Sequence, residues 1–232
     1  MNINNPESVS SELDFLSSLV KAGGLYSSPS GQQECVDKIS EALKSFEWDE
    51  VRIQQYTAGE LKRDPNYVPV TDFGDEYVDD EYRSKNNVIG ALRGTKPGNT
   101  VILNGHYDVE IITHPYRWER PWNSGEISDN KLWGRGSSDM LGGLSSQLYV
   151  ASRLAQNRDD WSGQIIFNAV ADEEVGGNGT LASLHALQSE GFLDAPESTA
   201  CLIAEPSSEV IGLESLGFLH MIIREEGLAR HM

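Results

Sequence analysis

The sequence predicts an α/β fold with a mostly parallel central sheet flanked by helices. Segments with helical periodicity alternate with short apolar segments along most of the chain. After residue 100 the apolar segments are nearly continuous hydrophobic runs, such as VILNG and IIFNAVA. Such runs are typical of parallel strands that are covered on both faces. The length of 232 residues allows one full domain and a piece of a second.

Two helices are expected at the start of the chain, over residues 8–21 and 28–46. The apolar stripe of the first consists of Leu13, Leu16, Leu19 and Val20, and that of the second of Val36, Ile39, Leu43 and Phe46. Ser30 and Gln33 have the spacing of a capping box, which predicts the start of the second helix.

The remaining elements follow from apolar periodicity and from turn-forming residues. We expect strands at residues 51–56, 87–94, 100–106, 164–171 and 199–205, and helices at residues 140–155 and 178–190. Residues 57–86 are polar and contain Pro65 and Pro69, which predicts a long surface loop. A second loop is expected over residues 110–131, where prolines and tryptophans alternate with polar residues.

The composition excludes several classes of function. The formal net charge of −18 argues against nucleic acid and anionic membranes as partners. The two cysteines, Cys35 and Cys201, are too few for a disulfide framework or a cysteine zinc site, so we expect two reduced thiols in the core. Neither a signal peptide nor an apolar run of membrane-spanning length is recognisable. The cytoplasm is therefore the expected location.

Potential metal ligands follow the ends of the predicted buried strands. They are His106 and Asp108, then Asp172, Glu173 and Glu174, and finally Glu205, while Asp139 precedes a predicted helix. In an extended chain residues i and i+2 point to the same side, so His106 and Asp108 should lie together. Ligands bind beyond the carboxyl ends of strands in open α/β sheets. Carboxylates crowded at that edge repel each other unless a cation neutralises them, and zinc is the most common choice for mixed N and O ligands.

Each of these residues taken alone has an ordinary structural explanation. A histidine at a strand end is usually hydrogen-bonded in a loop, and an aspartate before a helix is usually an N-cap. The combination of four such sites in chain order favours a metal centre. A nucleophile elbow of the form GxSxG is absent, and a dinucleotide-binding GxGxxG fails because Asp139 stands where the third glycine belongs. A serine hydrolase and a nucleotide-binding domain are therefore disfavoured.

Taken together, the segments GHYDV, WGRGSSDM, DEEVGG and AEPS resemble the M20 metallopeptidase and deacylase family. That family includes acetylornithine deacetylase, succinyl-diaminopimelate desuccinylase, carboxypeptidase G2-like enzymes and aminoacylases. The resemblance covers most of residues 80–232. It implies a zinc-exopeptidase-like fold, with an incomplete metal-dependent catalytic domain at residues 1–213. Residues 214–232 would form the first strand of a truncated α+β lid or dimerisation domain.

The resemblance also implies a role for each site residue. Two divalent metal ions are expected, most often zinc, with cobalt or manganese as alternatives. The implied metal ligands are His106 for the first ion, Asp139 as the bridge, Glu174 for the second ion and Glu205 as the last ligand of the first. The implied catalytic residues are Asp108, which orients the imidazole of His106, Glu173 as general base, and His231, the lid histidine that reaches the partner subunit's site.

The implied reaction is hydrolysis of the amide bond of an N-acyl amino acid or small peptide. A hydroxide that bridges the metals would attack the carbonyl, and Glu173 would carry the proton to the leaving amine. The full-length parent would be a homodimer that acts on small-molecule substrates.

Two departures from the family keep an alternative open. Leu141 stands where the family commonly has lysine, and no candidate remains for the late histidine of the second metal. The chain therefore resembles an amino-terminal fragment, for which we expect weak or no activity. The alternative is a catalytically inactive binding or regulatory protein that keeps the metallohydrolase fold.

Overall fold

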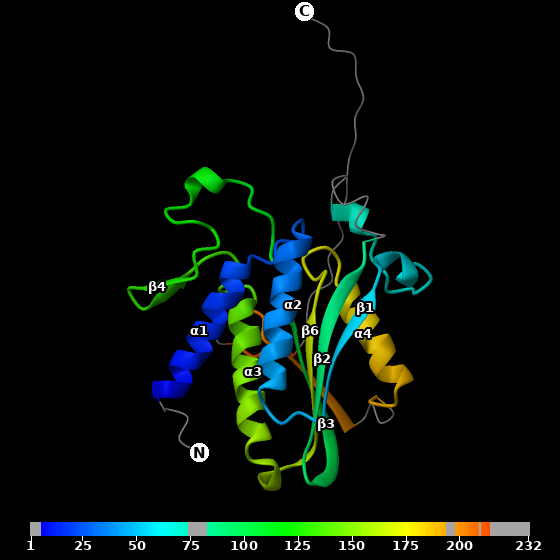
Figure 1. The fold of residues 1–232 in the computed structure, drawn as a ribbon. Helices are drawn as coiled ribbons and strands as arrows, with labels where there is room; N and C mark the ends of the chain where they lie inside the picture. The colour runs from blue at the N-terminus through cyan, green and yellow to red at the C-terminus, as the bar shows by residue number, and fades with distance from the viewer. Residues whose placement is uncertain (1–5, 74–82, 194–197, 209, 214–232) are drawn as a thin grey trace, which may run out of the picture.

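The computed structural model describes residues 6–73, 83–193, 198–208 and 210–213. Over these residues the chain forms three layers, with a central sheet between helices on both faces (Figure 1). The α/β class predicted from the sequence is confirmed.

Within the described residues, the central sheet has five strands in the order β1-β2-β6-β3-β7. Their bounds are Glu50–Tyr56 for β1, Lys85–Arg93 for β2, Lys96–His106 for β3, Ser162–Val170 for β6 and Thr199–Ile203 for β7. β3 lies between β6 and β7 and runs parallel to both. β2 is antiparallel to its neighbours β1 and β6, so the sheet is mixed, with four strands running in one direction. The reversal of β2 follows from its two-residue connection to β3, because a parallel arrangement needs a much longer crossover.

Helices α1 (Pro6–Ala22), α2 (Pro29–Lys44) and α3 (Leu141–Ala155) cover one face of the sheet, and α4 (Asn178–Ser189) covers the other (Figure 1). The larger core lies between the three helices and the sheet. Leu16, Leu19 and Val20 of the predicted α1 stripe are buried there, whereas Leu13 is exposed. A smaller core packs Leu187 of α4 against Ile89 and Ile166.

Helix α2 starts earlier than its predicted capping box. The side chain of Ser28 accepts a hydrogen bond from the backbone N–H of Gly31, and Pro29 occupies the first helical position. Proline is favoured there because its ring fixes φ and the missing N–H has no partner in the first turn. The prediction that Ser30 and Gln33 cap this helix is therefore wrong.

The predicted loop at residues 110–131 contains regular structure that the sequence analysis missed. After a short 3-10 turn at Pro115–Arg117, strands β4 (Glu126–Ser128) and β5 (Lys131–Trp133) form a hairpin. Its two turn residues, Asp129 and Asn130, have φ angles of 53° and 58°. These values are typical of the type I′ turns that connect tight hairpins, and Asp and Asn tolerate them better than most residues. The other predicted loop also contains 3-10 turns, at Ala58–Leu61 and Val70–Phe73.

Strand β7 is less buried than its apolar sequence predicts. It is the last strand in the sheet order, and Leu202 and Ile203 are each 55% exposed. The expectation that every strand after residue 100 is covered on both faces is therefore wrong for β7. Cys201 is exposed as well, so only Cys35 is the buried thiol that was expected.

Two further expectations concern membranes and the end of the chain. No helix of the described residues combines the length and the apolar character needed to cross a bilayer. The predicted lid strand at residues 214–232, including His231, lies outside the described residues.

Candidate metal centre

Three parallel strands deliver the predicted site residues to one edge of the sheet. β3 ends at His106, β6 leads into Asp172 and Glu173, and β7 leads into Glu205. Asp139 comes from a fourth segment, directly before α3. Because parallel strands end at the same edge, residues separated by up to 99 positions become neighbours.

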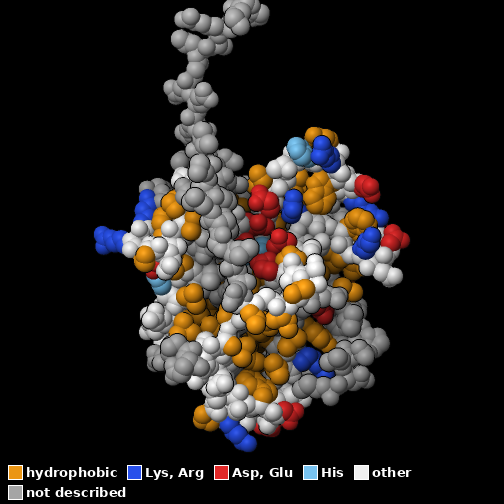
Figure 2. All heavy atoms as spheres, turned by 180° about the vertical axis from the view of Figure 1, so that it is seen from behind, with side chains coloured by type: hydrophobic (Ala, Val, Ile, Leu, Met, Phe, Trp, Pro, Cys, Tyr) orange, Lys and Arg blue, Asp and Glu red, His pale blue; other side chains and the backbone are white. Residues whose placement is uncertain are grey.

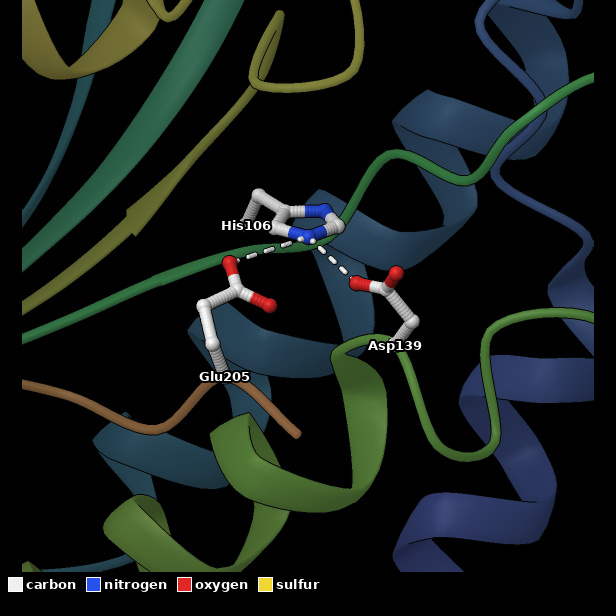
Figure 3. Close-up of side chains that lie close together, drawn as sticks. All are labelled: His106, Asp139 and Glu205. Carbon is white, nitrogen blue, oxygen red and sulfur yellow. Dashed lines mark hydrogen bonds and ion pairs between the residues drawn. The ribbon is translucent and has the colours of Figure 1, made fainter. Parts of the chain in front are cut away.

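The Nε2 atom of His106 is the centre of this group (Figure 3). It lies 3.2 Å from Oδ1 of Asp139, 3.5 Å from Oε1 of Glu205 and 3.7 Å from Oε2 of Glu173. Each of His106, Asp139 and Glu205 offers one ligand atom, and these three atoms lie within 4.8 Å of one another. Figure 2 shows a cluster of acidic side chains on one face of the molecule.

The other ring nitrogen fixes the orientation of the imidazole. Nδ1 of His106 is 2.8 Å from the main-chain carbonyl of Asp108, to which it donates a hydrogen. Such a bond directs Nε2 toward the carboxylates. The carboxylate of Asp108 lies farther away, at 3.7 Å, and accepts hydrogen bonds from the backbone N–H groups of Glu173 and Glu174 at 3.4 and 3.3 Å. Asp108 thus contacts both the histidine and the turn after β6.

The electrostatics of the site show an excess of negative charge. Burial raises the pKa of Asp108 to about 6, and that of Glu174 and of Glu205 to about 7. Burial alone would lower the pKa of His106, but the charges on Asp108 and Glu173 outweigh it and raise this pKa to about 9. The group therefore retains protons at neutral pH that a cation could replace.

Glu174 lies next to the three-residue group and outside it. Its Oε1 atom accepts a hydrogen bond of 3.0 Å from the backbone N–H of Glu110. This contact ties the turn after β6 to the segment after β3. Glu174 stays at the same edge of the sheet as Glu173.

A buried ion pair supports the turn that carries Glu173 and Glu174. The side chains of Lys85 and Asp172 are fully buried and form an ion pair, and the hydroxyl of Tyr56 donates to Asp172 at 3.0 Å. Asp172 has a φ of 63°, and its carbonyl accepts a 2.7 Å hydrogen bond from the N–H of Gly177. The sequence analysis missed Lys85 and Tyr56, because no sequence pattern pairs residues so far apart.

A glycine on α3 permits the position of Glu205. A Cβ atom on Gly143 would lie 2.0 Å from the carbonyl oxygen of Ala204, the residue before Glu205. Only a residue without a side chain allows this segment to pass so close to the first turn of α3. The neighbouring Leu141 is fully buried in the larger core.

The histidines elsewhere in the described chain do not join the group. His185 on α4 bonds to the carboxylate of Asp64 at 2.7 Å, and His114 is exposed in the loop after β3. The available donors are thus one imidazole nitrogen and several carboxylate oxygens. This donor set suits a hard or borderline divalent cation.

Comparison with known proteins places the chain among metallopeptidases and deacylases. The profile of peptidase family M20/M25/M40 matches residues 102–218, just over half of the chain. A succinyl-diaminopimelate desuccinylase of Wigglesworthia glossinidia brevipalpis is 33% identical over 134 residues, which are 57% of this chain and 34% of that protein. An N-formyl-4-amino-5-aminomethyl-2-methylpyrimidine deformylase of Halalkalibacterium halodurans is 35% identical over 103 residues, 44% of this chain and 24% of that protein. The chain thus spans about a third or less of these relatives.

Solved structures share the fold at lower identity. The di-peptidase Dug1p of Saccharomyces cerevisiae superposes with a TM-score of 0.60 and 18% identity, over 86% of this chain and 40% of that one. Human carnosine dipeptidase 1 gives 0.54 and 18%, over 85% of this chain and 37% of that one. The predicted resemblance is confirmed by the family match, and the chain belongs to peptidase family M20/M25/M40.

Proposed function

We propose that this chain carries the metal-binding part of a hydrolase that cleaves the amide bond of N-acyl amino acids or small peptides. The observation that carries the proposal is the arrangement at His106, whose Nε2 faces the carboxylates of Asp139 and Glu205 while Nδ1 is held by the main chain. The named relatives support the substrate class, since two of them remove an acyl group and two are dipeptidases.

Two divalent ions would fit the donors at this edge, most often zinc, with cobalt or manganese as alternatives. His106, Asp139 and Glu205 would hold one ion, and Asp139 and Glu174 would contribute to the second. Bound divalent ions polarise an amide carbonyl and lower the pKa of water. The proton transfers of the proposed reaction would be made by side chains of the protein.

Glu173 is the proposed general base. Its side chain is 46% exposed at the rim, and it is not one of the three grouped ligands. Its backbone is held by the bond to Asp108, so the carboxylate is positioned to take a proton from water and give it to the leaving amine nitrogen. His231 is proposed to reach the site of a partner subunit, with residues 214–232 as the start of the lid. That part of the proposal rests on the family resemblance alone.

The test combines metal content with hydrolysis. We expect Asp139→Asn to lose zinc, measured by competition with a chromophoric chelator. In a version of the protein that spans the full length of these relatives, Glu173→Gln should keep the zinc and lose hydrolysis of an N-acyl amino acid by at least about 100-fold, since general acid–base catalysis contributes that much or more. Asp64→Asn is the matched control, because Asp64 pairs with His185 away from the site.

The outcomes separate the two candidate functions. A folded chain that binds no zinc would contradict the metal centre. Zinc binding without hydrolysis of any N-acyl amino acid or dipeptide by the full-length protein would favour the binding or regulatory alternative, for which the buried Leu141 at a position where lysine is common is the supporting observation. Hydrolysis that survives in Glu173→Gln would remove the general-base role from Glu173.

A further inference from the structure

A second concave site, rich in arginine, is formed by residues of the segment between His106 and Asp139. It is a cavity of about 480 Å³ whose lining includes Arg117, Arg120 and Arg135, with Glu119 as the one acidic residue. The whole chain has 36 acidic and 18 basic residues. A cavity with three arginines and one glutamate therefore departs strongly from the average charge of this protein.

Two tryptophans contact two of the three arginine side chains. The guanidinium of Arg120 lies 4.4 Å from the ring centre of Trp133, and that of Arg135 lies 5.6 Å from the ring centre of Trp118. Arg120 also donates to the hydroxyl of Ser128 at 2.6 Å and pairs with Glu126 at 3.6 Å. Stacking on an indole face favours a fixed orientation of the guanidinium plane.

The cavity keeps hydrogen-bond donors without acceptors. Within the part of the chain that the structure describes, neither Arg117 nor Arg135 forms an ion pair with a carboxylate. Nε of Arg135 and Nε1 of Trp133 are buried and have no hydrogen-bond partner among those residues. Neighbouring positive charges cost free energy, and a bound oxyanion reduces that cost.

The segments that line the cavity are joined along the chain to those that carry the metal-centre residues. Gly134 and Arg135 line it and lead directly into the segment that carries Asp139. Thr113 lines the other side, three residues after Glu110, whose N–H bonds to Glu174. Figure 2 shows basic and hydrophobic side chains directly beside the cluster of acidic side chains.

We propose that this cavity binds a carboxylate of the substrate that is remote from the amide bond to be cleaved. Arginine suits a carboxylate because its planar fork donates two parallel hydrogen bonds, and the indoles offer a flat apolar surface to the carbon chain next to it. The net charge of −18 repels anionic substrates, so a local basic cavity is needed to retain one. The substrate class is then an acidic acylated amino acid or peptide. This inference rests on the proposed hydrolase function.

Direct binding tests the cavity independently of catalysis. Protein labelled with 15N is titrated with succinate at constant ionic strength and with a chelator present, so that no metal can bind the carboxylate. We expect saturable shifts of the indole N–H signals of Trp118 and Trp133, with no such shifts for the uncharged analogue succinamide. Arg117→Gln should weaken succinate binding about tenfold, the usual effect of losing one charge-assisted contact. Arg63→Gln is the matched control, since it removes an exposed arginine just after the Ala58–Leu61 turn.

Kinetics provide the second test. In the full-length protein that carries Arg117→Gln, kcat/KM for an N-succinyl amino acid should fall about tenfold, while that for the N-acetyl form of the same amino acid stays unchanged. The inference would be overturned if succinamide caused the same shifts as succinate, or if inorganic phosphate bound equally well. Unchanged succinate binding in both Arg117→Gln and Arg120→Gln would also overturn it. Those results would leave zinc binding and hydrolysis of N-acetyl substrates intact, so failure of the cavity is distinguishable from failure of the hydrolase.

Discussion

The imidazole of His106 has a fixed orientation and is protonated at neutral pH. The main-chain carbonyl of Asp108 accepts the Nδ1 hydrogen, and the surrounding carboxylates raise the pKa of the ring to about 9. A cation at Nε2 must therefore displace a proton at neutral pH. Glu205 is a second titrating candidate ligand, because burial raises its pKa to about 7.

We expect the affinity for zinc to fall as the pH is lowered. Each protonated ligand costs about tenfold in affinity for every pH unit below its pKa, so His106 alone predicts a loss of about 100-fold between pH 8 and pH 6. Competition with a chelator of known pH dependence measures this. His185→Gln should give the same profile, because His185 lies outside the group. A flat profile over this range would contradict the raised pKa of His106.

Among secondary-structure elements, β2 supports the site through a buried ion pair. Its first residue, Lys85, reaches the buried carboxylate of Asp172 and so holds the start of the turn that presents Glu173. Removing one partner of a buried ion pair leaves an uncompensated charge, which costs about 3–5 kcal/mol.

Lys85→Met should therefore lower the free energy of unfolding by about 3–5 kcal/mol, measured by urea denaturation. The double variant Lys85→Met/Asp172→Asn should recover part of that loss, because it also removes the stranded charge. Lys38→Met is the control, since its ion pair with Glu34 is exposed and should contribute less than about 1 kcal/mol. If Lys85→Met and Lys38→Met lowered the free energy of unfolding equally, the buried ion pair would stabilise the fold no more than the exposed one.

The close contact between α3 and the end of β7 gives a second prediction. Gly143→Ala adds a Cβ that would meet the carbonyl of Ala204, so the segment with Glu205 must move. Helix propensity alone favours alanine by up to about 1 kcal/mol, but a shift of the backbone to relieve this contact typically costs about 1–3 kcal/mol, so both stability and zinc affinity should fall. Val150→Ala, on the exposed side of the same helix, should leave zinc affinity unchanged. Unaltered zinc binding in Gly143→Ala would mean that Glu205 is not a ligand or that its segment tolerates the shift.

At the scale of the whole molecule, β7 is an edge strand with exposed apolar side chains. It is the outer strand of the sheet, and its two large apolar side chains at positions 202 and 203 are more than half exposed. Exposed apolar edge strands offer unpaired backbone groups to other chains.

We expect this chain to self-associate as its concentration rises and Leu202→Lys to reduce that tendency, as measured by sedimentation velocity. A charge on an edge strand opposes pairing with a second edge. Val150→Lys is the matched control, since it places the same charge on an exposed apolar residue of α3. If both variants behave alike, general solubility and not the β7 edge governs association.

The sequence by itself determined the fold class, the approximate positions of most elements and the family. These follow from local patterns, namely hydrophobic periodicity and short motifs at strand ends, which need no knowledge of distant contacts. The same patterns placed His106, Asp139 and Glu205 at one edge, because parallel strands must end together.

Only the tertiary structure decided how those residues are supported and what surrounds them. The pairing of Lys85 with Asp172, the passage of Ala204 past Gly143, the stacking of arginines on tryptophans and the exposure of β7 all depend on segments far apart in the sequence. Local propensity contains no information about such contacts, since each is created when the sheet order brings separate segments together. The position of β2 between β1 and β6 is one example, because chain order alone would place it beside β3.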